Sequence, residues 1–291
     1  MDIPYVTCDV FTHQAFGGNP LAVCYDARGL TSDQMQQIAT EFNYSETTFV
    51  LPPSAEGHDA QVRIFTPVSE IAFAGHPNVG TAVALAHLGF IEGRESLIFE
   101  EKAGLVPIEL EWLGGEIKSA TLTAPQAPKL GGEFDRVELA GVLGLDPDDI
   151  VTETHQPVMA SAGVYFLIIE VKDLKTLGRA QSPSAEEGAR ISGEGLFLYT
   201  NDGEASYRAR MFAPNHGIVE DPATGSAVAA FMGLKALQAV NDGEWYFQIV
   251  QGVEMDRSSL LNASFKRQHG EVTHIKVGGE AVMMREGVLS I

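Results

Sequence analysis

Two short apolar stretches, each following a turn-rich segment, decide the fold. Residues 75–89 read GHPNVGTAVALAHLG, and residues 225–234 read GSAVAAFMGL. Both are rich in Ala and Gly and are apolar on nearly every side, which is typical of a helix buried inside a domain. We therefore expect one buried helix in each half of the chain.

The segments before these two helices also match each other. GTAVA, from Gly80, resembles GSAVA, from Gly225, at a spacing of 145 residues (225 − 80). VRIFTP (62–67) resembles ARMFAP (209–214), and ETTFV (46–50) resembles EGLFL (194–198). Similar composition would explain a single match, but three matches in the same order indicate a duplicated unit. The sequence thus predicts two α+β lobes with a cleft between them.

Local patterns place further elements. Residues 30–42 have a capping box at Thr31 and Gln34 and apolar residues at helical spacing, so they predict an amphipathic helix. Residues 185–191 predict a short helix, and TAPQAPKLGG (123–132) a linker. Predicted strands are rich in β-branched and aromatic residues and cover 45–53, 60–67, 163–171, 194–200, 206–214 and two segments of 272–291 around Gly278.

Composition narrows the classes of function. The formal net charge of −20 argues against nucleic acid or an anionic membrane as partner, because both need clustered Lys and Arg. No signal peptide and no apolar run of about 18 residues is present, so we expect a cytoplasmic protein that does not span a membrane. Cys8 and Cys24, the two cysteines of the chain, receive no role.

The starts of the two buried helices are candidate anion sites. The first backbone N–H groups of a helix have no partner within it, and the helix dipole makes that end positive. Titratable groups lie near both starts: His76 at the first, Asp221 and Ser226 at the second, and Glu46 on the strand that precedes the first. A base, a second acid/base group, a histidine and a hydroxyl around one anion site are sufficient for proton transfer.

Other chemistries lack their sequence signatures. GHPNVGT resembles a P-loop but has no Lys for phosphate, and no G-x-G-x-x-G is present. The eight histidines form neither H-x-H nor H-E-x-x-H, and no G-x-S-x-G occurs. We therefore predict no metal, no cofactor and no serine nucleophile, which leaves general acid/base chemistry.

Four segments carry a resemblance to a known family. They are DVFTHQAFGGNPLAV (9–23), YSETTFV (44–50), FTPVSEIAFAGHPNVGTA (65–82) and MFAPNHGIVEDPATGSA (211–227). Together they resemble the phenazine-biosynthesis (PhzF-like) isomerases, which have the diaminopimelate-epimerase fold. The resemblance implies an α+β fold of two pseudo-symmetric lobes, each a curved, mostly antiparallel sheet around a central apolar helix. It also implies a homodimer.

The expected lobes are residues 1–124, joined by a last strand at 281–291, and residues 125–280, with the active site in the cleft between them. The resemblance implies an isomerase similar to trans-2,3-dihydro-3-hydroxyanthranilate isomerase, acting on a small carboxylate. Glu46 would be the acid/base group, assisted by His76, Asp221 and Ser226. The substrate-binding residues implied by the matching motifs are Asn19, Gly75, Pro77, Thr224 and Gly225.

Two alternatives stay open from the sequence. One is a protein that binds a small anion without turnover, which would not need Glu46 as a base. The other is an epimerase or racemase that uses carboxylates, with Glu46 facing Asp221, because the matching motifs lack the cysteine pair of related epimerases. A carboxylate that deprotonates carbon works best with a raised pKa, which we predict for Glu46.

Overall fold

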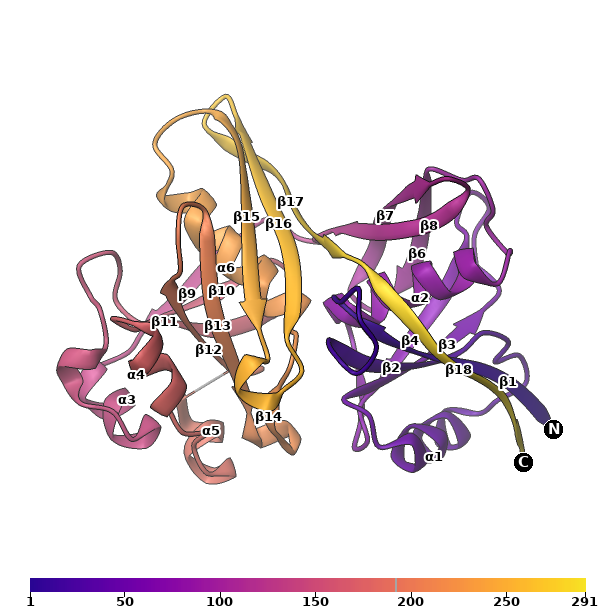
Figure 1. Cartoon of the computed structure of the whole chain (residues 1–291), viewed down its shortest axis with the longest axis horizontal. Helices are drawn as coiled ribbons and strands as arrows, with labels where there is room; N and C mark the ends of the chain where they lie inside the picture. Colours follow the sequence, from indigo (N-terminus) through magenta and orange to yellow (C-terminus); the bar gives the residue numbers. More distant parts are fainter. Residues whose placement is uncertain (192) are drawn as a thin grey trace. The chain divides into compact units, whose positions relative to one another are not determined.

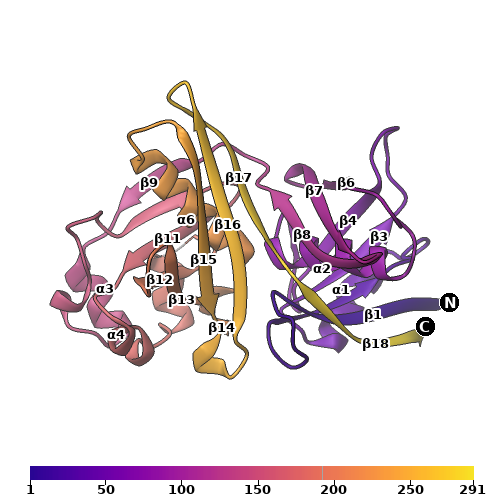
Figure 2. The ribbon, with the colours of Figure 1, turned by 45° about the horizontal axis from the view of Figure 1, so that its top comes forward.

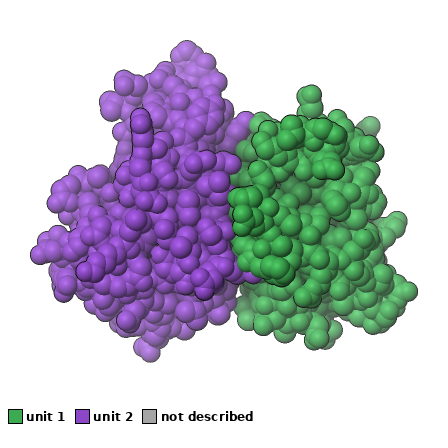
Figure 3. All heavy atoms as spheres, in the orientation of Figure 1, with its two compact units in different colours: residues 1–125, 277–291 green, residues 126–276 purple. Residues whose placement is uncertain are grey.

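The computed structural model describes residues 1–191 and 193–291, and the chain divides into two compact units (Figure 3). Unit 1 comprises Met1–Pro125 and Val277–Ile291, and unit 2 comprises Gln126–Lys276. The sequence had placed the change of lobe between residues 124 and 125 and the returning strand at 281–291. In the structure the change falls one residue later, inside the predicted linker.

Unit 1 is built on a sheet to which both ends of the chain contribute (Figure 1). Its strands pair in the order β18 (Ala281–Ser290), β1 (Asp2–Val10), β2 (Asn19–Cys24), β3 (Glu46–Leu51), β4 (Ala60–Phe65), β6 (Ser96–Glu101), β7 (Gly104–Leu113) and β8 (Glu116–Thr123). The short β5 (Glu70–Ile71) also pairs with β4. All neighbours are antiparallel except β2–β3 and β4–β6.

Unit 2 repeats this order. Its strands run β9 (Lys129–Glu133), β10 (Val158–Ser161), β11 (Tyr165–Glu170), β12 (Leu196–Asn201), β13 (Ser206–Ala213), β15 (Gly243–Gln251) and β16 (Ser259–Gln268). The short β14 (Ile218–Asp221) pairs with β13, and the parallel pairs are β11–β12 and β13–β15. From β10 to β16 the pattern of pairing is that of β1 to β7, as a duplication requires. After β16, β17 (Glu271–Gly279) leads the chain back to unit 1.

One apolar helix is central to each unit. In unit 1, α2 (Gly75–His87) is buried from Gly75 to Ala86 and packs on β1, β2, β7 and β8. In unit 2, α6 (Gly225–Gln238) packs on β10, β11 and β16, and Figure 2 shows it behind β15 and β16. The expected fold class, a curved and mostly antiparallel sheet around an apolar helix in each of two lobes, is confirmed.

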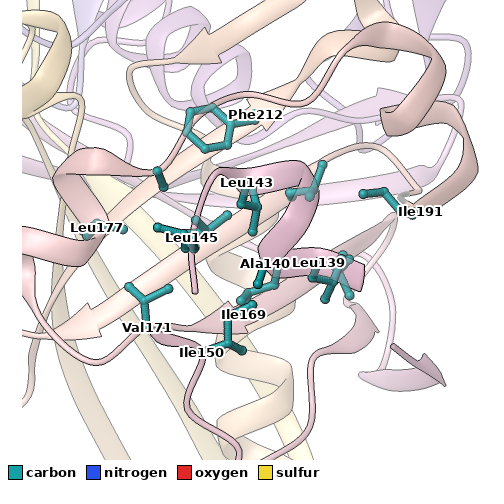
Figure 4. Packing of buried hydrophobic residues seen from close by; sticks show 14 residues of the cluster. Leu139, Ala140, Leu143, Leu145, Ile150, Ile169, Val171, Leu177, Ile191 and Phe212 are labelled. Carbon is teal, nitrogen blue, oxygen red and sulfur yellow. The ribbon is translucent and has the colours of Figure 1, made fainter. Parts of the chain in front are cut away.

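The remaining helices cover the outer face of each sheet. In unit 1, α1 (Ser32–Phe42) has the predicted capping box and buries Met35, Ile38 and Ala39. In unit 2, α3 (Arg136–Leu143), α4 (Leu174–Arg179) and α5 (Ala185–Ile191) pack on the sheet through one apolar cluster (Figure 4). Short 3₁₀ turns are η1 (Pro147–Asp149), η2 (Pro214–His216) and η3 (Val253–Met255).

The structure corrects the register of the sequence repeat. GTAVA starts at Gly80, which lies in the middle of α2, whereas GSAVA starts at Gly225, the first residue of α6. The two helices start at Gly75 and Gly225, which are 150 residues apart (225 − 75). The predicted match at 145 residues was wrong because small residues recur wherever a buried helix packs closely, at any position along it. Also contrary to prediction, Lys129–Glu133 of the linker forms β9.

Close packing of α2 explains Gly80. A Cβ atom at this position would lie 2.6 Å from Leu21 Cδ2 and 2.6 Å from Val10 Cγ2, and both neighbours are fully buried. These distances are shorter than any ordinary contact between carbon atoms, so a side chain here would displace the strands that hold α2.

We expect Gly80→Ala to destabilise unit 1. Overpacking a core costs about 1–3 kcal/mol, whereas Ala in a helix gains about 1 kcal/mol over Gly. The control is Gly141→Ala in α3, where a Cβ meets nothing within 4 Å, and which should stabilise by about 0.5–1 kcal/mol. Urea unfolding of both variants measures the difference, and equal free energies of unfolding would contradict close packing at Gly80.

Candidate active site

Four residues of unit 1 form a polar group at the start of α2. Glu46 begins β3, and its Oε2 lies 3.3 Å from Nε2 of His76, in the first turn of α2. Nδ1 of His76 lies 3.2 Å from Nδ2 of Asn19, and Ser45 Oγ donates to Asn19 Oδ1 at 3.0 Å. We call Asn19, Ser45, Glu46 and His76 the unit 1 polar group.

Backbone geometry positions the side chains of Asn19, Ser45 and Glu46. Gly18 has a φ of +61°, and a Cβ there would lie 2.3 Å from the carbonyl oxygen of Val10, so only glycine fits. Asn19 follows at once and starts β2, which pairs in parallel with β3 so that Leu21 lies opposite Glu46. The starts of two neighbouring parallel strands therefore carry three members of the group.

Burial sets the charge of His76. Its side chain is 3% exposed, and burial lowers its pKa from 6.5 to about 3, so the imidazole is neutral at physiological pH. The Glu46 side chain is 12% exposed. A carboxylate that keeps this exposure next to a neutral ring can still be reached by a small molecule.

A second polar group lies at the start of α6, in unit 2. Asp221 ends β14, and its Oδ2 accepts a hydrogen bond from Thr224 Oγ1 at 2.5 Å. Gln251, at the end of β15, donates to the Asp221 carbonyl at 2.7 Å and to Thr224 Oγ1 at 3.1 Å, and accepts from the Thr224 amide at 3.2 Å. Asp221, Thr224 and Gln251 are the unit 2 polar group, and all three are buried.

Both central helices start without a capping side chain among the residues described. The first-turn amides of α2 belong to Gly75 and His76, because Pro77 has no N–H, and those of α6 belong to Gly225, Ser226 and Ala227. Ser, Thr, Asp or Asn usually caps such an end. Uncapped amides next to a titratable group are suited to bind the carboxylate of a ligand.

A matching ion pair holds the segment before each helix. In unit 1, Arg63 donates from Nε and Nη2 to the carboxylate of Glu70 at 2.8 and 2.7 Å. In unit 2, Arg210 makes the same two bonds to Glu220 at 2.8 and 2.7 Å, and its Nη1 donates to the Ala180 carbonyl. Since Glu220 precedes Asp221, this pair fixes the strand that presents Asp221.

The structure brings together the predicted residues of each half. Glu46, His76 and Asn19 meet in unit 1, next to Gly75 and Pro77. Asp221 and Thr224 meet in unit 2, next to Gly225 and Ser226. The side chains of Asn19 and Thr224 bond to His76 and Asp221, and their role in substrate binding stays a prediction.

Sequence reasoning missed four polar residues. Ser45 and Gln251 orient other side chains by hydrogen bonds that only tertiary structure creates. Glu101, at the end of β6, lies beside Asn78 of α2, and burial raises the pKa of its carboxyl well above 4.5, which the Asn78 amide only partly offsets. No short motif marks these positions as functional. Ser45 lies within the S-E-T segment (45–47), and Asn78 lies within the G-H-P-N segment (75–78).

Metal-binding clusters and membrane-spanning helices are absent from residues 1–191 and 193–291. This part of the chain contains no cluster of three or more His, Cys, Asp or Glu side chains arranged to bind a metal ion. It likewise contains no helix with the length and apolar character needed to cross a bilayer. Cys8 and Cys24 are buried free thiols, and burial raises the pKa of both, to about 12 for Cys24.

Comparisons of the sequence and of the structure with known proteins identify the same family. The family of phenazine biosynthesis-like proteins matches residues 8–287. An uncharacterised isomerase of Mesorhizobium japonicum is 38% identical (99% of this chain, 98% of the relative). The trans-2,3-dihydro-3-hydroxyanthranilate isomerase of Pseudomonas chlororaphis is 35% identical over 98% of both chains. The crystal structure of a PhzF-family phenazine biosynthesis protein of Bacillus anthracis superposes with a TM-score of 0.86, at 29% identity and full coverage of both chains.

We expect Gln251→Leu to loosen the unit 2 polar group. The substitution removes the hydrogen bond that Gln251 donates to the Asp221 carbonyl and the one that it accepts from the buried Thr224 amide, and losing the partner of a buried group costs about 1–3 kcal/mol. The control is Gln248→Leu, an exposed position of the same strand, which should change stability by less than about 0.5 kcal/mol. Urea unfolding compares the two, and equal midpoints would show that Gln251 does not support the group.

Proposed function

The chain belongs to the phenazine biosynthesis-like family and is an isomerase of the PhzF type, and from this premise we propose that it moves a proton between carbons of a small carboxylate. Glu46 is the acid/base group in this proposal. The observation that carries it is the contact of Glu46 with a neutral, buried histidine beside uncapped helix amides. A carboxylate in that setting can take up and return a proton, and it has a proposed anion site next to it.

The reaction has two steps on one carboxylate. Ionised Glu46 removes a proton from a carbon of the substrate, and the electron pair moves into the conjugated double bonds of the substrate. Protonated Glu46 then returns the proton to a different carbon, which leaves the double bond shifted and the enzyme unchanged. No atom or electron is gained or lost overall, so an isomerisation of this type requires neither a redox cofactor nor a second substrate.

Binding of the substrate carboxylate is assigned to the helix starts. The protein carries a net charge of −20, which repels anions in general, so an anionic substrate needs a local site with donors. Amides at Gly75, His76, Gly225 and Ser226 supply such donors without a capping side chain to displace. Because α2 and α6 are buried and rigid, these donors are already in place before the substrate binds.

Asp221 is assigned the second polar role. Its carboxylate accepts a short hydrogen bond from Thr224 and is 3% exposed, so it is held in one orientation. We propose that it binds an amino or hydroxyl group of a substrate. The relatives named as trans-2,3-dihydro-3-hydroxyanthranilate isomerases support this class of substrate, a small unsaturated carboxylate with a polar substituent.

The decisive measurement is hydrogen exchange with solvent. Wild-type protein and Glu46→Gln are incubated in D₂O with trans-2,3-dihydro-3-hydroxyanthranilate, and NMR follows deuterium at each carbon. We expect deuterium at the position of the shifted proton with wild type, and a loss of at least about 100-fold in Glu46→Gln, the typical effect of removing a general base. Glu41→Gln, at an exposed position of α1, serves as the control with full activity expected.

Three other results would contradict the proposal. Full exchange in Glu46→Gln would remove Glu46 from the reaction, and inversion of a stereocentre without a double-bond shift would favour an epimerase. Binding of the compound with no exchange in either protein would favour an anion-binding protein. If Glu46 and Asp221 act on one substrate, the double variant Glu46→Gln, Asp221→Asn should be no slower than the slower single variant, because residues that act as a unit are not additive.

A further inference from the structure

We infer that Ser45 and Asn19 are positioning residues that hold His76 as the neutral tautomer with hydrogen on Nε2, a donor toward Glu46 that accepts no proton. Each contact of the unit 1 polar group then has a defined donor and a defined acceptor. The position of the ring hydrogen follows from the structure alone. Its effect on turnover rests on the proposed function.

The contact with Glu46 determines where the ring hydrogen of His76 lies. An ionised carboxylate has only hydrogen-bond acceptors, and its Oε2 lies 3.3 Å from Nε2 of His76. A bare ring nitrogen at that position would place two lone pairs opposite each other in a buried site. A hydrogen on Nε2 turns the same contact into an attractive one, so Nε2 carries the hydrogen.

The other ring nitrogen must then be an acceptor. A neutral imidazole has one N–H and one lone pair, and burial keeps this ring neutral. Nδ1 of His76 therefore needs a donor, and Nδ2 of Asn19 lies 3.2 Å away. Of the two ends of the Asn19 amide, only the NH₂ end can satisfy this lone pair.

Ser45 bonds to the other end of the amide and holds it in the orientation that the ring requires. Its hydroxyl donates to Asn19 Oδ1 at 3.0 Å, which places the NH₂ group on the side of His76. With the amide turned over, Oδ1 would require a hydrogen on Nδ1, and Nε2 would then face the Glu46 carboxylate without one. The direction of each bond is thus consistent with all the others.

The two ends of this series of hydrogen bonds are also joined through the backbone. Ser45 and Glu46 are consecutive, so the start of β3 provides both the first donor and the last acceptor of the series. Asn19 and His76 are buried, and they belong to β2 and α2, two elements that pack on each other. Because three packed elements hold the side chains, neither the amide nor the ring can turn without breaking at least one bond.

The consequence for catalysis is a division of roles within the group. Both ring nitrogens of His76 are occupied, one by hydrogen and one by the Asn19 amide, so the ring cannot take the proton that Glu46 removes from the substrate. Glu46 is then the one proton carrier of this group. The Nε2 hydrogen has no well-aligned acceptor among the described residues, and it is placed to bond to Glu46 or to negative charge that forms on the substrate.

The inference is tested first without substrate. Ring ¹⁵N chemical shifts distinguish the two neutral tautomers from each other and from imidazolium, and His76→Gln identifies the signals of His76. We expect the Nε2–H form in wild type, unchanged from about pH 5 to pH 8, the range in which an ordinary histidine titrates. His58, whose Nδ1 contacts Glu100 at 2.6 Å, provides a second histidine–carboxylate pair in the same spectra.

Asn19→Asp is the informative variant because it replaces the donor by an acceptor of the same shape. We expect hydrogen to move to Nδ1, either as the other tautomer or as imidazolium, and kcat in the exchange assay to fall about 10- to 100-fold, as for the loss of a hydrogen bond to a charged group. Ser45→Ala should give a mixture of the two tautomers. Gln37→Glu, the same amide-to-acid change on the exposed face of α1, should leave both the ring signals and kcat unchanged.

Any of three results overturns the inference: an Nδ1–H ring in wild type, titration of His76 near neutral pH, or the same ring signals in Asn19→Asp as in wild type. If Asn19→Asp does not fold, the spectra of wild type and Ser45→Ala decide alone. A wild-type protein with the Nε2–H ring but no hydrogen exchange on any carboxylate would refute the proposed function, while the position of the ring hydrogen would stand.

Discussion

The structure depends on one constraint, the burial of an apolar helix inside each sheet. Such a helix satisfies its own backbone except at its ends, where the first amides need partners that an apolar core cannot supply. In both units the start of the helix meets polar residues instead of a capping side chain. The same packing demands small residues, so that Gly80 lies against Leu21 and Val10 with no room for a Cβ. Stability of the core and availability of uncapped helix amides therefore have a common origin.

Duplication explains why this arrangement occurs twice. Strand order and direction agree between the units, and so does the bidentate ion pair of Arg63 with Glu70 and of Arg210 with Glu220. Both arginines also lie over a phenylalanine two residues later in the same strand, at 5.1 and 4.8 Å from the ring centre. These contacts keep the segment before each central helix in one conformation, which fixes the residues at the helix start.

The sequence was sufficient to predict the repeat, the two apolar helices and the capping box of α1, because these depend on local patterns. It was also sufficient to group Glu46 with His76, because both lie in distinctive motifs. It was insufficient for the register of the repeat, since Ala and Gly recur along any closely packed helix. It was also insufficient for Ser45 and Gln251, whose roles depend on which amide or hydroxyl lies opposite in space. The bond from the Asn19 side chain to His76 likewise could not be predicted from the sequence. Hydrogen-bond direction is a property of the folded group, and no spacing of letters specifies it.

The differences between the units favour isomerisation over inversion. Inversion by two bases needs acid/base groups on opposite faces of one carbon, and a duplicated fold would most simply provide them at equivalent positions. With the helix starts 150 residues apart, the counterpart of His76 is Ser226. The strand pairing of the matched residues Arg63 and Arg210 makes Gly195 the counterpart of Glu46, and Ile71 that of Asp221. Neither carboxylate therefore has an acid/base group as its counterpart in the other unit. In unit 1 a carboxylate contacts a neutral ring, and in unit 2 a carboxylate is bound by Thr224. With Glu46 as the proposed proton carrier, the lack of an equivalent acid/base group in the other unit matches a reaction in which a proton leaves one carbon and returns to another.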